Sequence, residues 1–307
     1  KVGELTGFLS YVLQILNSLM MISNVFLLLT RSMASGARIL EVIDEKVDLT
    51  DEKVRNIEVE RGSVDFEHVW FKYKKEAKEY VLSDVSFHIE AGQTVGVIGQ
   101  TGAAKSTLVQ LIPRLYDATE GVVKVDGVPV QEYPMAHLRE AIAMVLQKNT
   151  LFSGSLLDNL RWGKEDASME EIEEACRIAC VDEVLERLPE GYETEMGQGG
   201  VNVSGGQKQR ICIARALLKK PKILILDDST SAVDTATEAK IRERMGAALP
   251  DMTKIIIGQR ISSVRHADQI IILDDGRVSA IGTHEELLAR SEIYQQIYES
   301  QKEGVEL

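Results

Sequence analysis

The sequence is poor in cysteine, proline and aromatic residues, and the shortage of cysteine excludes a whole class of protein. Of 307 residues, three are cysteine, six are proline and 5% are aromatic. Three cysteines cannot form the disulfide framework that holds many small secreted domains together. Cys176 and Cys180 share one face of a predicted helix, but no second Cys or His cluster accompanies them. We therefore predict buried thiols at Cys176, Cys180 and Cys212 rather than a metal site.

Positive charge is also scarce. The 35 Lys and Arg residues are outnumbered by 48 Asp and Glu residues, which gives a net charge of −13. A nucleic-acid-binding surface needs a basic stripe, so we exclude nucleic acid as a partner. The acidic balance favours a soluble domain that faces the cytoplasm.

One segment lacks charge altogether. Residues 5–30 form an uncharged run of 26 residues, and a helix needs roughly 20 apolar residues to span a bilayer. The run is longer than the apolar part of a secretory signal and lacks its small-residue cleavage site. Arg31 and Arg38 follow the run and place its C-terminal end in the cytoplasm. We predict a transmembrane helix with a cytoplasmic extension over residues 1–45, in contact with the lipid bilayer.

The predicted membrane helix has one polar face. Ser10, Gln14, Asn17 and Asn24 fall within an arc of about 80°. Such a face packs on other helices or lines a substrate path, and the sequence of one helix leaves both open. The chain starts at Lys1 inside this helical pattern, so we expect further membrane helices upstream in a longer polypeptide.

The rest of the chain alternates between strand and helix patterns. A polar stretch over residues 46–63 is expected to be a linker, before a domain over 64–302 and a short tail at 303–307. Strands are predicted at 64–73, 81–90, 222–228, 253–259 and 268–275, with a helical insertion over about 147–218. This alternation predicts an α/β fold around a mostly parallel sheet.

The stretch VGVIGQTGAAKSTLVQLI, residues 95–112, carries the first chemical motif. Its spacing matches a phosphate-binding loop between a strand and a helix, although Ala104 replaces the second glycine. Backbone N–H groups at the helix start would bind phosphate, with Lys105 supplying charge and Ser106 a Mg²⁺ ligand. The residues predicted to bind nucleotide here are Gly99, Thr101, Gly102, Ala103, Ala104, Lys105, Ser106 and Thr107.

A second motif completes the phosphate site. In KILILDDST, residues 222–230, four apolar residues precede Asp227, whose carboxylate can hold Mg²⁺ at the end of a strand. Between the two motifs lies VSGGQKQRICIARALL, residues 203–218. This segment resembles the signature motif of ATP-binding cassette (ABC) proteins, and residues 64–302 then align with that family's nucleotide-binding domain.

The resemblance implies a fold and further site residues. The expected fold is the P-loop NTPase type, with a mostly parallel core sheet, an antiparallel β-subdomain and a helical subdomain. Tyr73 matches the aromatic residue that stacks on adenine, and Gln147 the glutamine that senses Mg²⁺ and contacts the membrane domain. Residues 231–234, ending in Asp234, resemble the dimer-contact loop, and GTHEELL at 282–288 matches a motif near the family's C-terminus.

The signature explains itself physically. Ser204, Gly205, Gly206 and Gln207 stand at a helix start, where a hydroxyl and free N–H groups suit a phosphate. In this family the phosphate belongs to ATP held by a second subunit, so ATP sites are shared. A membrane helix running into the cassette is similar to the last helix of an exporter half, which implies five helices before Lys1 and a multi-pass protein of the cell membrane.

Three positions depart from the family pattern. Asp228 stands where the family usually has a catalytic glutamate. Its shorter side chain moves the carboxylate by about one bond, and a misplacement of this size can lower the rate of hydrolysis roughly 10²-fold. Gln259 stands in place of the switch histidine and cannot carry a proton. If position 104 needs positive φ, Ala104 costs about 1–2 kcal/mol and weakens ATP binding. GQGG at 197–200 also differs from the usual Gly-Glu-Arg-Gly.

The combined pattern resembles the degenerate subunit of a heterodimeric exporter. Such a subunit binds Mg²⁺ and ATP, hydrolyses slowly at its own site and lends its signature to a partner half-transporter. The alternative is a membrane-anchored nucleotide sensor without transport. A soluble cassette acting on ribosomes or DNA is disfavoured by the uncharged run and the acidic charge. The transported substrate cannot be read from one membrane helix.

Overall fold

The computed structural model describes residues 2–52, 54–229 and 232–303. The chain divides into two units, residues 1–50 and 51–307, which are described separately. Thr230 and Ser231, and residues 304–307 of the expected tail, lie outside the described residues.

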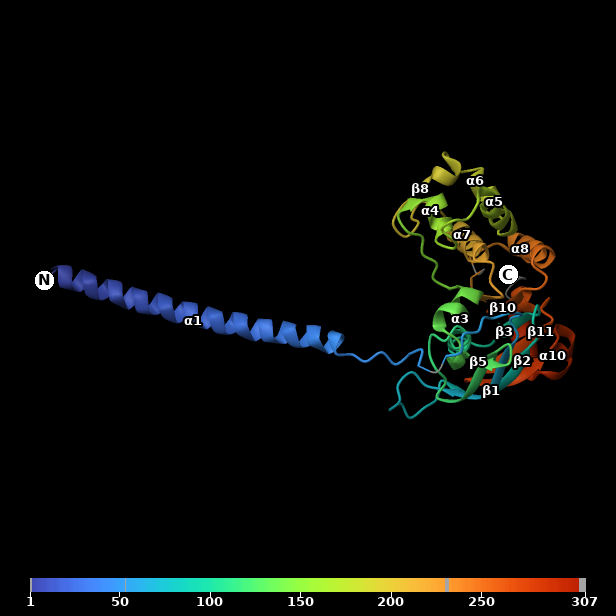
Figure 1. Ribbon diagram of the computed structural model, residues 1–307, viewed down its shortest axis with the longest axis horizontal. Helices are drawn as coiled ribbons and strands as arrows, with labels where there is room; N and C mark the ends of the chain where they lie inside the picture. Colours follow the sequence, from blue (N-terminus) through green and yellow to red (C-terminus); the bar gives the residue numbers. More distant parts are fainter. Residues whose placement is uncertain (1, 53, 230–231, 304–307) are drawn as a thin grey trace. The chain divides into compact units, whose positions relative to one another are not determined.

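The first unit is formed mainly by the helix α1 (Val2–Ile43), drawn in blue in Figure 1. None of its 42 residues is buried, and it is long and apolar enough to cross a membrane, with a mean hydropathy of 1.9 over its best window. The hydroxyls of Ser10, Ser18, Ser23 and Thr30 each donate to the carbonyl four residues earlier. Hydroxyls bonded in this way do not need water, so they suit an apolar surrounding.

The second unit is built on a six-stranded sheet in the order β12-β11-β3-β10-β9-β6. Its strands are β3 (Thr94–Ile98), β6 (Ile142–Val145), β9 (Ile223–Asp227), β10 (Thr253–Ile257), β11 (Gln269–Asp274) and β12 (Arg277–Gly282). All neighbours pair in parallel except β11 and β12. The β9 residues are all buried, as the run KILILD predicts for a strand covered on both faces. The predicted α/β fold with a mostly parallel core is confirmed.

Two smaller sheets complete the strand structure. A four-stranded antiparallel sheet has the order β2-β1-β4-β5 and contains β1 (Val64–Phe71), β2 (Leu82–Ile89), β4 (Glu120–Val125) and β5 (Val128–Pro129). The alternation of buried and exposed residues along β2 is the alternation seen in its sequence. A two-stranded sheet pairs β7 (Gly154–Ser155) with β8 (Glu195–Met196).

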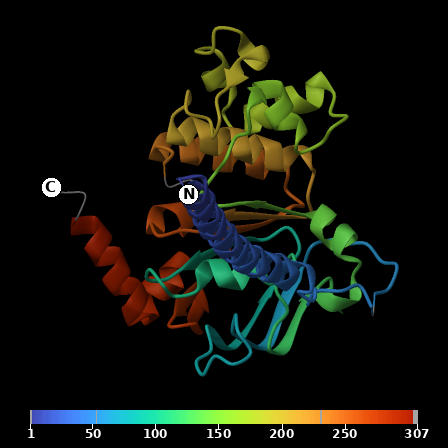
Figure 2. The same ribbon diagram turned by 90° about the vertical axis from the view of Figure 1, so that its left-hand side faces the viewer.

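Helices cover the six-stranded sheet, and several of them gather at one end (Figures 1 and 2). That group contains α4 (Leu156–Arg161), α5 (Met169–Ile178), α6 (Asp182–Leu185) and α7 (Gly205–Leu218) and shares one hydrophobic core. The remaining helices are α2 (Lys105–Gln110), α3 (Met135–Ala141), α8 (Thr235–Ala248), α9 (Ile261–Val264), α10 (His284–Arg290) and α11 (Glu292–Glu303), with 3₁₀ turns η1 (Val130–Glu132) and η2 (Gly191–Glu193). Cys176, Cys180 and Cys212 are buried free thiols, as predicted.

Within the second unit, hydrogen bonds and an ion pair hold the polar residues that precede β1. The carboxylate of Asp126 accepts hydrogen bonds from four consecutive backbone N–H groups, those of residues 60–63, at 2.8–2.9 Å. Further upstream, the guanidinium of Arg55 pairs with Glu132 at 2.6 Å. Burial would raise the pKa of Asp126, but the four N–H donors outweigh burial and hold that pKa below its ordinary value.

Candidate nucleotide site

The phosphate-loop sequence lies where its motif predicts, between β3 and α2. Residues 99–104 leave the carboxyl end of β3, and Lys105 is the first residue of α2. A Cβ on Gly99 would collide with the carbonyl oxygen of Leu273, so only glycine fits there. Open α/β sheets bind ligands at the carboxyl ends of their strands, and this loop occupies that edge.

Ala104 adopts a left-handed conformation, with φ 68° and ψ 24°, and caps α2 without a side-chain hydrogen bond. The position therefore needs the positive φ that glycine adopts freely. An alanine in this region is strained by about 1–2 kcal/mol. The departure at Ala104 thus has a backbone cost at the point where the loop turns into the helix.

Lys105 and two carboxylates form the charged centre of the site. The ammonium of Lys105 donates to the carbonyl oxygens of Gly99 and Gln100, both at 2.8 Å. Burial lowers the pKa of Lys105, while the carboxylates of Asp228 and Asp227 oppose that shift. A half-buried ammonium that is hydrogen-bonded to two carbonyl oxygens is suited to bind a phosphate.

Asp227 lies beside Ser106, and the two supply the oxygen atoms that Mg²⁺ prefers. The Ser106 hydroxyl donates to Oδ1 of Asp227 at 3.0 Å, and Asp227 is only 5% exposed. Burial raises the pKa of Asp227, and the bond from Ser106 lowers it in part. A bound Mg²⁺ would favour the ionised carboxylate, so these residues fit the ion expected with ATP. Among the residues described, no group of three or more His, Cys, Asp or Glu is placed so that it could hold a metal ion by itself.

Three polar side chains follow three adjacent strands and meet at one oxygen. Asp228 follows β9, Gln259 follows β10 and Gln147 follows β6. Nε2 of Gln147 and Nε2 of Gln259 each donate to Oδ2 of Asp228 at 3.0 Å. Asp228 itself has φ 48°, and its N–H donates to Ile257. The carboxylate is thus held by two neutral amides.

Tyr73 lies close to α2. Its side-chain hydroxyl forms a hydrogen bond of 2.8 Å with the Thr107 hydroxyl. Tyr73 is 51% exposed, and its ring contacts Tyr116 edge to face, with centroids 5.1 Å apart. An exposed ring at this position offers a surface for a nucleobase. Sequence reasoning missed Tyr116, because only the fold brings it beside Tyr73.

These groups line one open cavity of about 340 Å³. Its lining includes Thr101, Gly102, Ala104, Lys105, Ser106, Thr107, Gln147, Asp227, Asp228 and Gln259. Most of the predicted nucleotide and Mg²⁺ residues are therefore brought together. Gly99 and Ala103 lie in the phosphate loop. Tyr73 is hydrogen-bonded to Thr107, which lines the cavity.

The signature residues do not line this cavity, in the part of the chain that the structure describes. Ser204 caps α7 by accepting from the N–H of Gln207, while the Gln207 side chain accepts from the N–H of Ser204. Gly205 and Gly206 form the first turn of α7. The N–H groups at this helix start are suited to bind an anion that comes from outside the chain.

The dimer-contact segment is described only in part, because Ser231 lies outside the described residues. Asp234 caps α8 by accepting from Thr237. Oε1 of Gln209, a buried residue of α7, accepts from the N–H of Ala232 and so joins the signature helix to this segment. A glutamine on the buried face of a helix was the sequence signal for this contact.

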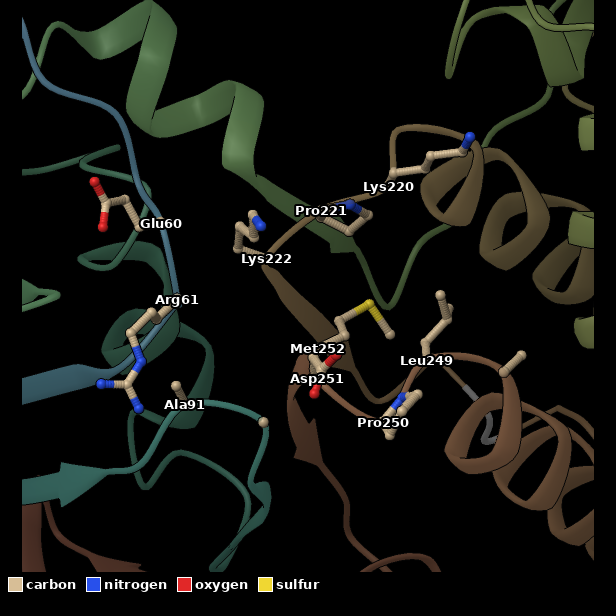
Figure 3. A pocket seen from close by; sticks show the side chains of 12 residues that line it. Glu60, Arg61, Ala91, Lys220, Pro221, Lys222, Leu249, Pro250, Asp251 and Met252 are labelled. Carbon is tan, nitrogen blue, oxygen red and sulfur yellow. The ribbon is translucent and has the colours of Figure 1, made fainter.

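A larger cavity of about 660 Å³ lies elsewhere, beside the amino ends of β9 and β10 (Figure 3). Its lining includes the charged residues Arg61, Lys222 and Asp251 and the apolar residues Pro221 and Met252. It contains neither the phosphate loop nor the paired carboxylates. The chemistry of the side chains, and not cavity size, therefore identifies the nucleotide site.

Known proteins support this assignment. The sequence model described as ABC transporter matches residues 82–231. The solved structure titled as a bacterial Atm1-family ABC exporter with ATP bound superposes with a TM-score of 0.83, at 35% identity, over 89% of this chain and 48% of that one. The second unit is an ABC-type ATP-binding domain.

Relatives of this ABC domain extend the match over α1. The ABC transporter ATP-binding protein YfiB of Bacillus subtilis is 45% identical over 100% of this chain and 53% of its own length. The multidrug export ATP-binding/permease protein YgaD of the same species is 43% identical, and an ATP-dependent lipid A-core flippase of Legionella pneumophila is 36% identical. The chain spans about half the length of these relatives.

Proposed function

We propose that this chain is part of one half of a heterodimeric ABC exporter. In this proposal α1 crosses the cell membrane, the ABC domain faces the cytoplasm, and a second half-transporter shares two ATP sites with it. The match with an exporter structure, the exporter names of relatives and the apolar α1 support the exporter role.

One observation carries the asymmetric part of the proposal: Asp228 is held by two glutamine amides. Hydrolysis needs a group that orients the attacking water and a group that stabilises charge on the γ-phosphate. The amide of Gln259 can neither carry a positive charge nor transfer a proton. The shorter Asp228 carboxylate is engaged by both Gln147 and Gln259. We therefore expect this site to bind Mg-ATP and to hydrolyse it slowly.

The signature is complete, in contrast to the hydrolytic residues. Ser204 and Gln207 form a reciprocal cap at the start of α7. In our proposal this helix start contacts the γ-phosphate of ATP held by the partner. Preorganised donors of this kind contribute roughly 3–4 kcal/mol each to a transition state.

The test compares two substitutions in the assembled heterodimer. Among the residues described, a Cβ on Gly205 would meet the Ala232 side chain alone, at 3.5 Å, whereas a Cβ on Gly206 would lie 2.7 Å from the Ala232 carbonyl oxygen. Gly205 can therefore be replaced with little disturbance inside this chain. Gly205→Asp should abolish ATP hydrolysis by the complex, and Lys105→Ala should reduce it far less. Equal losses from both would mean two equivalent sites and would refute the asymmetric mechanism.

A further inference from the structure

The C-terminal helix α11 is hydrogen-bonded to the backbone of Gln259 and Ile261 through one side chain. The Gln301 side chain donates from Nε2 to the carbonyl oxygen of Gln259 at 2.7 Å. Its Oε1 accepts from the N–H of Ile261 at 2.8 Å. A glutamine amide has one donor end and one acceptor end, so these two bonds fix its orientation. The segment from Gln259 to Ile261 is thus bridged by a single side chain.

Helix α11 is itself held firmly. Tyr294 is fully buried, and its hydroxyl forms a hydrogen bond of 2.8 Å with Nδ1 of His284 on α10. Tyr294 belongs to a hydrophobic cluster that also contains Ile261 and Ile98. Ile98 is the last residue of β3, immediately before the phosphate loop. The helix that carries Gln301 therefore packs on the elements that lead into the nucleotide site.

Gln259 connects the hydrogen bond from Gln301 to the nucleotide site. The backbone of Gln259 is bonded to Gln301, while its side chain donates to Oδ2 of Asp228 at 3.0 Å. A freely rotating loop would let this side chain leave the carboxylate. We propose that Gln301 is a positioning residue, which fixes the Gln259 segment so that residue 259 faces Asp228 and the nucleotide. The catalytic part of this inference rests on the proposed ATP-hydrolysing function.

The contact can be tested without any nucleotide, by amide hydrogen exchange in the full chain. Gln301→Leu removes the amide group and with it both bonds, and keeps an apolar side chain of similar bulk. Gln295→Leu is the matched control, because Gln295 also lies on α11 and donates at 2.7 Å, but to Leu288. We expect exchange at Ile261 to accelerate about tenfold in Gln301→Leu and to stay unchanged in Gln295→Leu. Unchanged exchange at Ile261 in Gln301→Leu would overturn the proposal.

The consequence for catalysis is tested with a hydrolytically restored site. In the heterodimer carrying Asp228→Glu and Gln259→His, addition of Gln301→Leu should lower kcat about three- to tenfold and leave the KM for ATP unchanged. Gln295→Leu should leave kcat unchanged. Equal losses of kcat in both variants would show a general effect of α11 and would overturn the positioning role. If the parent complex binds no ATP, the proposed function fails, while the exchange experiment still decides whether Gln301 holds the segment.

Discussion

Nε2 of Gln259 lies 3.0 Å from Oδ2 of Asp228 and donates to it. In the ABC proteins that this sequence resembles, positions 259 and 228 usually hold a histidine and a glutamate. Here two substitutions meet in one hydrogen bond, so they cannot be judged independently. A glutamate at position 228 would clash with or displace the Gln259 amide. A histidine at position 259 would face an aspartate, whose side chain is shorter than that of the usual glutamate.

We therefore predict that Asp228→Glu and Gln259→His act together. The double substitution should raise ATP turnover at this site at least tenfold in a complex with a competent partner signature, whereas each single change should give much less. Steady-state ATPase measurements on the four variants form a double-mutant cycle. Additive effects of the two changes would contradict the coupling.

Replacing Ala104 with glycine should tighten nucleotide binding. The left-handed backbone at Ala104 is strained by about 1–2 kcal/mol, although glycine loses roughly 0.5–1 kcal/mol more entropy on folding. The methyl group also lines the nucleotide cavity. Titration with a labelled ATP analogue and Mg²⁺ measures the change. Ala103→Gly is the control, because Ala103 has no positive φ, and equal gains from both would argue against strain at 104.

The ring of Tyr73 should matter more than its hydroxyl. Stacking of a base on an aromatic side chain is worth about 1–3 kcal/mol, and we expect Tyr73→Ala to weaken ATP binding at least fivefold. Tyr73→Phe removes the hydrogen bond to Thr107 but keeps the ring, so it should change the Kd little. A large effect of Tyr73→Phe in the same binding assay would assign the role to the hydroxyl instead.

Asp126 should make the stability of the second unit depend on acid. The pKa of Asp126 is lower in the folded state, so its contribution is complete above the ordinary value of 3.8 and is lost as the pH falls through the folded-state pKa. Asp126→Asn should cost about 1–3 kcal/mol of unfolding free energy at pH 7. Denaturant unfolding at pH 7 and near pH 3 measures this, and the gap between variant and wild type should be smaller at the lower pH. A gap of constant size would rule out the carboxylate as its source.

Much of the fold followed from pattern, and the exceptions have physical causes. The buried run before Asp227 and the glycine-rich turn after Ile98 are local signals, so their strand and loop were predictable. The family resemblance assigned Gln147, Asp228 and Gln259 to one site, but their hydrogen bonds at Oδ2 of Asp228 were not predictable, because they depend on the strand order that places β9 between β10 and β6. The hydrogen bonds from residues 60–63 to Asp126 were also not predictable, because they join positions more than sixty residues apart in the sequence.

The hydrogen bond that Ser204 accepts affects the choice of variants and links ligand binding to helix α7. Its hydroxyl oxygen already accepts from the N–H of Gln207, which leaves the hydroxyl proton free to point outward. A ligand that takes this proton would polarise the O–H and strengthen the cap, so recognition and the order of α7 would rise together. Because α7 has 14 residues, this cap begins a helix about 21 Å long that packs in the shared helical core. Ser204→Ala would remove both roles at once, and threonine is the substitution that preserves them.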